Sequence, residues 1–178
     1  MNAVVKILIL TRGAPGCGKS TFLAQNGLAQ FVISPDLIRE EIGIVEYDQK
    51  GDPQIGYFNE EDVWREVKHE IRNRMEKDVP IIVDATFQTP RHIEMPLRLA
   101  KQFKYQLLFV DFTNISKDLA KRQNAMRAGW RRVPVEIIDR AYANFQRYRI
   151  PDNGQVKKLT PTQFISSDIY KLLQSTSF

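Results

Sequence analysis

The sequence contains a single cysteine, only two histidines and no apolar run long enough to cross a bilayer. Because one cysteine, Cys17, cannot form a disulfide within the chain, we expect a reducing, cytoplasmic setting. No set of histidines and cysteines has the spacing of metal ligands, so we expect no structural zinc. Lys6 interrupts the apolar run near the N-terminus, which also lacks the features of a secretory signal. We therefore expect no association with a membrane.

The composition is that of an ordinary globular protein, with 43% hydrophobic and 26% charged residues among 178. This length fits a single domain over residues 1–178. The net charge of +5 is uneven, because nine cations and only three acids lie between residues 117 and 149. The cations are Lys117, Lys121, Arg122, Arg127, Arg131, Arg132, Arg140, Arg147 and Arg149. Such a cluster is either a solvated helix face or a surface for the phosphates of a nucleotide or a nucleic acid.

Short β-branched segments alternate with longer amphipathic segments along most of the chain. We expect strands at residues 4–11, 31–34, 80–84, 106–112 and 155–159. We expect helices near residues 19–29, 36–42, 60–77, 91–103, 116–127, 134–147 and 162–173. Asn59, Pro90 and Pro134 stand where residues that begin helices belong. The alternation predicts an α/β fold with a doubly wound, mainly parallel sheet flanked by helices.

The stretch RGAPGCGKST, residues 12–21, fits the phosphate-loop pattern G-x-x-x-x-G-K-[ST] between an expected strand and an expected helix. Glycines recur because backbone N–H groups can surround an anion only where bulky side chains stay clear. Lys19 is expected to reach the β- and γ-phosphates, and Ser20 to bind Mg²⁺. We interpret Cys17 as a filler of this loop rather than as a redox group. The pattern predicts that ATP or another purine triphosphate is bound by Gly13, Ala14, Pro15, Gly16, Cys17, Gly18, Lys19, Ser20 and Thr21.

Two aspartates follow expected strands, at the sheet edge where doubly wound proteins bind ligands. Asp84 ends the run PIIVD, where a carboxylate can hold Mg²⁺ through water; the alternative is a capping or turn residue. Asp36 stands three residues before Arg39, so the two side chains share one helix face. Asp36 can then accept the proton of an attacking hydroxyl while Arg39 binds a phosphate of the acceptor. The alternative is that Asp36 caps the helix and that Arg39 is a surface residue.

The chain resembles the kinase domain of 5′-polynucleotide kinases of the phage type, and related P-loop phosphotransferases. Four segments carry this resemblance by their order and separation: GAPGCGKST, SPDLIRE, IIVDATF and NAMRAGWRRVP. The resemblance runs from about residue 4 to residue 148, and the D-x-x-R after the second strand is its most specific part. It implies a P-loop kinase fold with a helical lid at about residues 127–133. Two positions depart from the family pattern: Arg122 is one place out of register, and Phe87 replaces a polar residue.

The resemblance assigns a role to each matching residue. It implies that Lys19 and Ser20 are the phosphate-loop pair, and that Asp84 is the acid beside that loop. It implies that Asp36 activates the acceptor 5′-hydroxyl and that Arg39 holds the neighbouring phosphate.

The same resemblance makes Arg127 a lid arginine that reaches over the transferred phosphate. Arg131 would assist at the nucleotide and Arg132 at the acceptor. Gly129 would let this lid hinge, and closure would exclude water that competes for the phosphate. The alternative is that these arginines are ordinary surface charges.

Residues 43–58 depart from the alternation of strands and helices, with three glycines, one proline and mixed charges. We interpret them as an excursion from the sheet edge that walls the acceptor site. Tyr47, Tyr57 and Phe58 would then stack on a base. The alternative is that these aromatic side chains form a satellite hydrophobic cluster.

These features predict a kinase that uses ATP and Mg²⁺ and transfers the γ-phosphate to a nucleic acid hydroxyl, most simply the 5′-OH of DNA or RNA. One alternative is a DNA kinase for a hydroxymethyl pyrimidine base, which must be extruded from the helix. Another is a kinase for a nucleoside, sugar or antibiotic. A nucleotide-driven switch or mechanical ATPase is a different class, and it would leave Asp36 and Arg39 without a role. The oligomeric state stays open.

Overall fold

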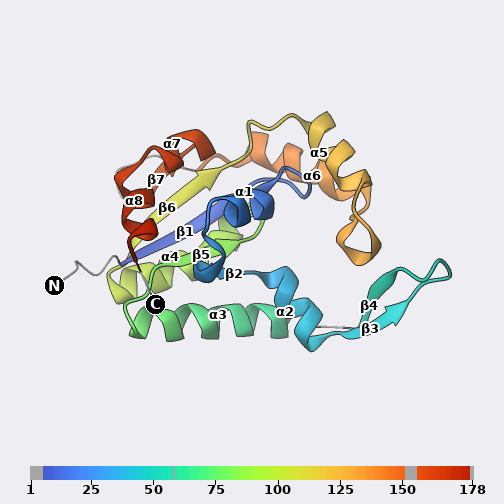
Figure 1. Cartoon of the computed structure of the whole chain (residues 1–178), viewed down its shortest axis with the longest axis horizontal. Helices are drawn as coiled ribbons and strands as arrows, with labels where there is room; N and C mark the ends of the chain where they lie inside the picture. The colour runs from blue at the N-terminus through green and yellow to red at the C-terminus, as the bar shows by residue number, and fades with distance from the viewer. Residues whose placement is uncertain (1–5, 58, 151–155, 177–178) are drawn as a thin grey trace.

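The computed structural model describes residues 6–57, 59–150 and 156–176. Its central sheet has five parallel strands in the order β2-β5-β1-β6-β7 (Figure 1). These strands are β1 Ile7–Arg12, β2 Val32–Ile33, β5 Ile81–Asp84, β6 Gln106–Asp111 and β7 Val156–Leu159. The predicted α/β class and parallel sheet are therefore confirmed.

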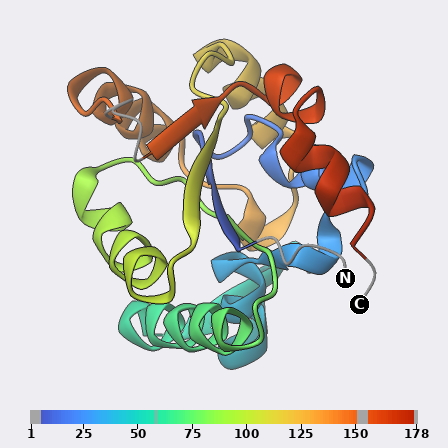
Figure 2. The same ribbon diagram turned by 90° about the vertical axis from the view of Figure 1, so that its left-hand side faces the viewer.

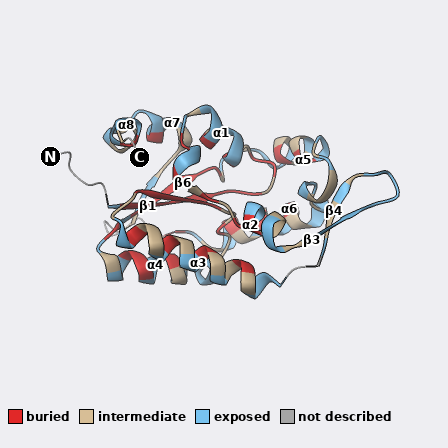
Figure 3. Ribbon diagram, turned by 60° about the horizontal axis from the view of Figure 1, so that its bottom comes forward, coloured by how far each residue is buried: buried red, intermediate tan, exposed pale blue. Residues whose placement is uncertain are grey.

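The central strand β1 explains why the sheet has helices on both faces. Ile7 and Ile9 point into one hydrophobic cluster and Leu8 and Leu10 into the other, and all four are at most 1% exposed. A strand that is buried on both faces carries a continuous apolar run rather than an alternating one. The result is three layers, with the buried strands between two layers of helices (Figures 2 and 3).

The two helical layers cover opposite faces of this sheet. The face that receives Leu8 and Leu10 is covered by α2 (Pro35–Ile42), α3 (Glu60–Glu76) and α4 (Pro90–Phe103). The other face is covered by α1 (Lys19–Gln25), α5 (Lys117–Ala125), α6 (Val135–Arg147), α7 (Pro161–Ile165) and α8 (Asp168–Gln174). The four-residue steps of α3 place Val63, Val67, Ile71 and Met75 in the core, as the pattern predicts.

Residues that begin helices agree largely with the prediction. The side chain of Asn59 accepts a hydrogen bond from the backbone N–H of Glu61, 2.9 Å away, and so caps α3. Pro90 is the first residue of α4, as expected. Helix α6 begins at Val135, so Pro134 is the residue before its first turn instead of the first residue in it.

The excursion contains regular structure that the sequence analysis does not predict. It is an antiparallel hairpin of β3 (Ile44–Tyr47) and β4 (Pro53–Tyr57), which projects from the body of the molecule (Figure 1). The carboxylate of Asp48 shapes its turn by accepting hydrogen bonds from the N–H groups of Lys50 and Asp52. All residues of β3 are exposed, so the hydrophobic alternation that reveals a half-buried strand is missing.

Three predicted helices have different bounds in the structure. The expected helix at 162–173 is divided into α7 and α8, because Ser167 begins a new helix and caps it. Helix α1 stops at Gln25, before the 3₁₀ turn η1 (Ala29–Phe31), and α5 stops at Ala125. Within the described residues, no helix is long and apolar enough to cross a membrane. Positions 4, 5, 58 and 155 of the predicted segments lie outside the described residues.

Candidate active site

The phosphate loop, residues 13–20, connects the end of β1 to the start of α1. Gly16 and Gly18 have φ angles of +81° and +90°, a conformation that other residues adopt only with strain. A Cβ atom at Gly16 would collide with the carbonyl oxygen of Ala120 in α5, and one at Gly13 would lie 2.6 Å from the Sγ atom of Cys17. The glycines therefore permit both the turn and its close packing against α5.

The amino group of Lys19 lies at the centre of this loop. Its Nζ atom donates hydrogen bonds to the carbonyl oxygens of Gly13 at 2.9 Å and Ala14 at 3.0 Å, and the residue is only 8% exposed. Beside it, Cys17 is buried, and this burial raises the pKa of its thiol. The loop thus offers a fixed cation to an anion, and Cys17 fills space as predicted.

Asp84 lies at the end of β5, next to the phosphate loop. Its Oδ2 atom accepts a hydrogen bond from Ser20 Oγ at 2.6 Å, and its Oδ1 atom accepts one from Thr11 Oγ1 at 3.0 Å. The next helix begins only at Pro90, with Thr89 before it, so Asp84 does not cap a helix. A carboxylate and a hydroxyl are hard oxygen ligands of the kind that Mg²⁺ prefers, so Ser20 and Asp84 fit a magnesium site.

Asp36 and Arg39 share one face of α2. Ser34 caps this helix by accepting a hydrogen bond from a backbone N–H group, so Asp36 is not needed as the cap. The Nη1 atom of Arg39 lies 2.5 Å from Asp36 Oδ1. This leaves the carboxylate of Asp36, whose side chain is 68% exposed, at the edge of the site.

Arg39 is bound by Glu60 as well as by Asp36, a contact that its three-residue spacing from Asp36 does not predict. Its Nε and Nη2 atoms bind the two carboxylate oxygens of Glu60, on α3, at 2.7 and 2.9 Å. Burial alone would lower its pKa, but the hydrogen bonds and charges of Glu60 and Asp36 outweigh burial and raise the pKa. The guanidinium is therefore bound on two edges by carboxylates, and an acceptor phosphate would have to compete with Glu60 for it.

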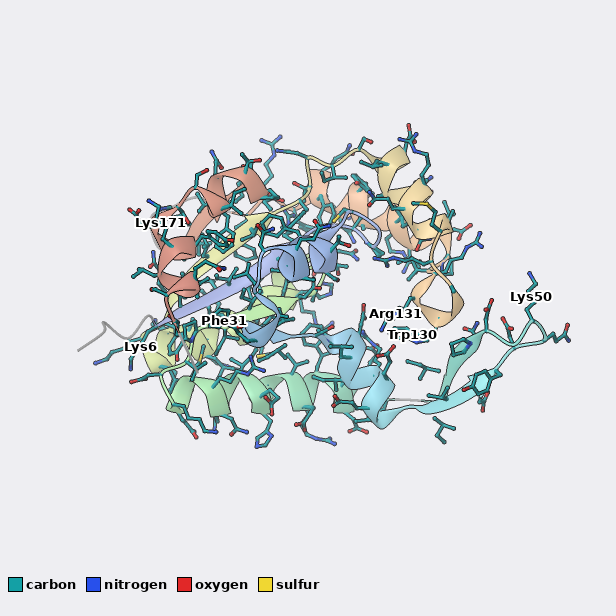
Figure 4. The ribbon with its side chains drawn as sticks, viewed as in Figure 1. Lys6, Phe31, Lys50, Trp130, Arg131 and Lys171 are labelled. Atoms are coloured by element: carbon teal, nitrogen blue, oxygen red, sulfur yellow. The ribbon has the colours of Figure 1, made fainter. Side chains whose placement is uncertain are left out.

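The lid, residues 127–133, follows α5 directly. Its helical content is the single 3₁₀ turn η2 (Gly129–Arg131), less than the helical lid that the resemblance implies. Asn124 is 2% exposed and fixes the far end of the lid, because its side chain both accepts from and donates to the backbone of Val133. Arg131 forms an ion pair of 2.9 Å with Glu40 of α2, so the lid bridges to the helix that carries Asp36. In Figure 4, Arg131 and Trp130 lie between the lid and α2.

The structure brings most of the predicted site residues around one cavity of about 330 Å³, called here the central hollow. Of these predicted residues, the central hollow is lined by Pro15, Lys19, Ser20, Asp36, Arg39, Asp84, Arg127 and Arg131. A second hollow, which opens toward α1 and β2, shares Ser20, Asp36, Asp84, Arg127 and Arg131. The residues expected at the nucleotide and those expected at the phosphate acceptor are thus adjacent. Two hollows lead to them from different sides.

Other predicted residues lie elsewhere. Arg132 lines a separate hollow between the lid and the hairpin, together with Lys50 at the hairpin tip (Figure 4). Tyr47 is 72% exposed on β3, whereas the side chain of Tyr57 and the whole of Phe58 lie outside the described residues. Arg122 lines neither of the two hollows that share Ser20, within the part of the chain that the structure describes.

Several residues of the central hollow are not predicted from the sequence. The two tryptophans of the chain, Trp64 and Trp130, both line it, as do Thr86 and Gln88 after β5. Their rarity is the only signal that singles out the tryptophans. Glu60 carries no motif, because its contact with Arg39 spans 21 positions of the chain.

The loop after β5 is held in a strained conformation. Phe87 is 1% exposed and has a φ angle of +43°, so its side chain packs in the core while its neighbours face the hollow. The Nε atom of Arg12 donates a hydrogen bond to the Phe87 carbonyl at 3.2 Å. Asn144 in α6 donates one to Gln88 at 2.9 Å. These contacts fix the direction in which Gln88 points.

Comparisons with known proteins agree with this geometry. The sequence of residues 8–150 matches a family described as an AAA domain, and no curated protein matches the chain. A chain of the Pnkp1/Rnl/Hen1 RNA repair complex is similar with a TM-score of 0.61 and 19% identity, over 80% of this chain and 45% of that one. A proposed kinase from Chloroflexus aurantiacus has a TM-score of 0.56 and 17% identity over 96% of both chains. A sugar kinase from Janibacter sp. HTCC2649 has a TM-score of 0.55 and 13% identity, over 95% of this chain and 91% of that one.

These similar structures come from an RNA repair complex, a proposed kinase and a sugar kinase, and at such identities they establish the fold alone. The chain spans less than half the length of the RNA repair chain that it matches. The phosphate loop, the parallel sheet and the family match, which covers most of the sequence, agree with one another. The chain belongs to this AAA domain family and has the fold of a P-loop kinase.

Proposed function

We propose that this chain transfers the γ-phosphate of ATP to a hydroxyl of nucleic acid, most simply the 5′-OH of DNA or RNA. The observation that carries the proposal is the central hollow, in which Lys19, Asp84, Asp36 and Arg127 line one cavity. A phosphate donor and a hydroxyl acceptor can therefore meet without a long movement of the backbone. Phosphoryl transfer needs chiefly such positioning and charge neutralisation.

On the donor side, the triphosphate would take the place of the loop carbonyls that now accept hydrogen bonds from Lys19. Ser20 and Asp84 would hold Mg²⁺, which supplies positive charge between the phosphate oxygens. Arg127 would stabilise the charge on the transferred phosphate, as a lid arginine does in related chemistry.

On the acceptor side, Asp36 would take the proton of the hydroxyl as its oxygen attacks the γ-phosphorus. The new P–O bond forms as the bond to the β-phosphate oxygen breaks, and ADP leaves. Arg39 would act through Asp36, because it lies between Asp36 and Glu60 and fixes the direction of the carboxylate.

A small-molecule kinase is the second candidate, and the contact between Arg39 and Glu60 favours it. The carboxylate of Glu60 occupies the Nε–Nη2 edge of the guanidinium, where an acceptor phosphate would otherwise bind. A nucleoside, sugar or antibiotic hydroxyl does not require that phosphate contact. The two candidates therefore differ in whether the acceptor must be a polymer.

The test is transfer of label from γ-labelled ATP with Mg²⁺ to a panel of acceptors. The panel contains 5′-OH DNA and RNA oligonucleotides, the same oligonucleotides with blocked 5′ ends and a hydroxymethyl base, and free nucleosides and sugars. The proposal predicts label on the 5′-OH oligonucleotides alone. Label that survives 5′ blocking would move the activity to the base, and label only on small molecules would support the second candidate.

A further inference from the structure

Another cavity, separate from the hollows described above, lies between the N-terminal ends of α3 and α4 and is called here the α3–α4 groove. Its volume is about 350 Å³. It is lined by Glu60, Glu61, Trp64, Arg91, His92 and Met95. Trp64 also lines the central hollow, so its indole forms part of the wall of both cavities. Glu60 lines the groove while its carboxylate binds Arg39 on the acceptor side. The groove therefore adjoins the side of the central hollow that holds Asp36 and Arg39.

Three of the six side chains that line this groove, Trp64, His92 and Met95, are flat or polarisable, and the other three are charged. The indole of Trp64 packs edge-on against the buried ring of Phe87, with ring centroids 6.5 Å apart, and this contact fixes its plane. Met95 is half-buried and packs against the same core. Partial burial, and then the charge of Arg91, lower the pKa of His92, which favours the uncharged imidazole. An aromatic wall beside a thioether and an uncharged imidazole suits a flat, uncharged ring.

We propose that the α3–α4 groove binds the nucleobase of the nucleotide that carries the acceptor hydroxyl. This inference rests on the proposed function, since it places the hydroxyl at Asp36 and the base against Trp64. Stacking on an aromatic side chain accepts any base, because every base has a π-face. The groove would thus hold the acceptor without reading its sequence.

The charges of the groove do not select a phosphate. Its lining holds the carboxylates of Glu60 and Glu61 and the guanidinium of Arg91, so it has no excess of positive charge that would attract the phosphates of a nucleic acid backbone. The exposed carboxylate of Glu61 can accept a hydrogen bond from an exocyclic amino group of a base. The occupant is therefore an uncharged heteroaromatic ring, while phosphates remain in the central hollow, beside Lys19 and Arg127.

The test compares two 5′-OH oligonucleotides that differ only in whether the 5′-terminal nucleotide carries its base. With the wild type, we expect kcat/KM to be about 5- to 150-fold higher for the oligonucleotide with the base, the range that one stacked base supplies. His92→Ala and Met95→Ala should each reduce this ratio severalfold, with KM for ATP unchanged. The matched control is His69→Ala, which removes the other, exposed histidine and should leave the ratio unaltered.

Equal rates on the two oligonucleotides, or a ratio that neither variant changes, would overturn the inference. If no nucleic acid is labelled at all, the proposed function fails and the groove is tested by binding alone. In Trp130→Phe protein, free adenosine should quench the fluorescence of Trp64, and His92→Ala should weaken that quenching. Quenching of this kind supports the groove independently of catalysis, and its absence overturns it.

Discussion

Lys19, Asp84 and Thr11 are polar side chains that the fold buries, with exposed fractions of 8%, 9% and 0%. Burying a charge is costly unless it is hydrogen-bonded, and each of these groups has a bonded partner at the site. Asp36 differs, because it is exposed and bonded to Arg39. The buried groups thus lie where we propose that the nucleotide binds, and the exposed acid lies where we propose that the acceptor binds.

Lys19→Ala tests the role of the phosphate loop. The variant loses the cation at the centre of the phosphate loop, so kcat should fall about 10²–10³-fold with every acceptor. Steady-state kinetics with varied ATP measures this loss. Lys171→Ala is the control, because Lys171 forms an exposed ion pair with Asp168 and should be replaceable without effect. Wild-type kinetics in Lys19→Ala would refute the role of the loop.

Asp36→Asn removes the carboxylate that we propose as the proton acceptor but keeps the shape of the side chain. Transfer should fall about 10²–10⁴-fold while the affinity for ATP stays nearly intact. Asp168→Asn is a matched control, since Asp168 also pairs with a cation three residues on, Lys171, at 2.9 Å. Full transfer activity in Asp36→Asn would show that another group takes the proton.

At the scale of elements, the lid is connected to both sides of the site. Arg131 binds Glu40 of α2, and Asn124 of α5 holds the end of the lid at Val133. Gly129 lies against Pro53 of the hairpin strand β4. The lid is therefore linked to α2 and to the hairpin.

Gly129→Ala tests this connection. Gly129 has a φ of +56°, and a Cβ atom there would collide with the carbonyl oxygen of Pro53. Gly51→Ala is the control, because Gly51 has a φ of +80° but nothing within 4 Å of the added atom. Both variants should lose about 1–2 kcal/mol of unfolding free energy from the left-handed backbone, and Gly129→Ala should lose more because of the collision with Pro53. Only Gly129→Ala should also lose transfer activity; equal activity in both variants would contradict the connection.

The sequence predicts the elements that have local signals. The phosphate loop has a motif, β1 has a continuous apolar run and α3 has apolar residues at helical spacing, so their positions agree with the structure. The hairpin is missed because β3 is exposed on both faces. Glu60 is missed because it meets Arg39 only after α2 and α3 pack together. Contacts between distant segments leave no trace in a single sequence.

At the scale of the whole molecule, the basic segment 117–149 is partly neutralised by the fold. Asp139 binds both Lys117, at 3.0 Å, and Lys121, at 2.8 Å. Arg131 is paired with Glu40. The positive charge available to an acceptor is therefore smaller than the sequence suggests, and part of it stabilises the packing of α5 on α6.

Two tyrosines on opposite faces of the sheet should make the free energy of unfolding depend on pH in the alkaline range. Burial, followed by the charge of Asp78, raises the pKa of Tyr105 to about 12, and burial raises that of Tyr142 to about 12. An unfolded tyrosine ionises near pH 10, so the unfolded chain loses these protons first as the pH rises. Their contribution to stability is full below about pH 10 and is lost as the pH rises through about 12.

Urea unfolding between about pH 9 and about pH 11.5 measures this loss. Tyr105→Phe and Tyr142→Phe should each make the decline with pH shallower. Tyr47→Phe serves as the control, since its side chain is 72% exposed and makes no core contact to lose. An alkaline decline that neither core variant changes would contradict the assignment.

The central claim is that one hollow joins a nucleotide site to a nucleic acid acceptor site, and ADP release tests it most directly. ADP formation from γ-labelled ATP and Mg²⁺ is measured with and without a 5′-OH oligonucleotide, together with the label that the oligonucleotide gains. The account predicts slow ADP formation alone, strong stimulation by the oligonucleotide, and one labelled phosphate gained for each ADP. ADP formation at the same rate without the oligonucleotide, and no label in it, would contradict the claim and indicate an ATPase or a different acceptor.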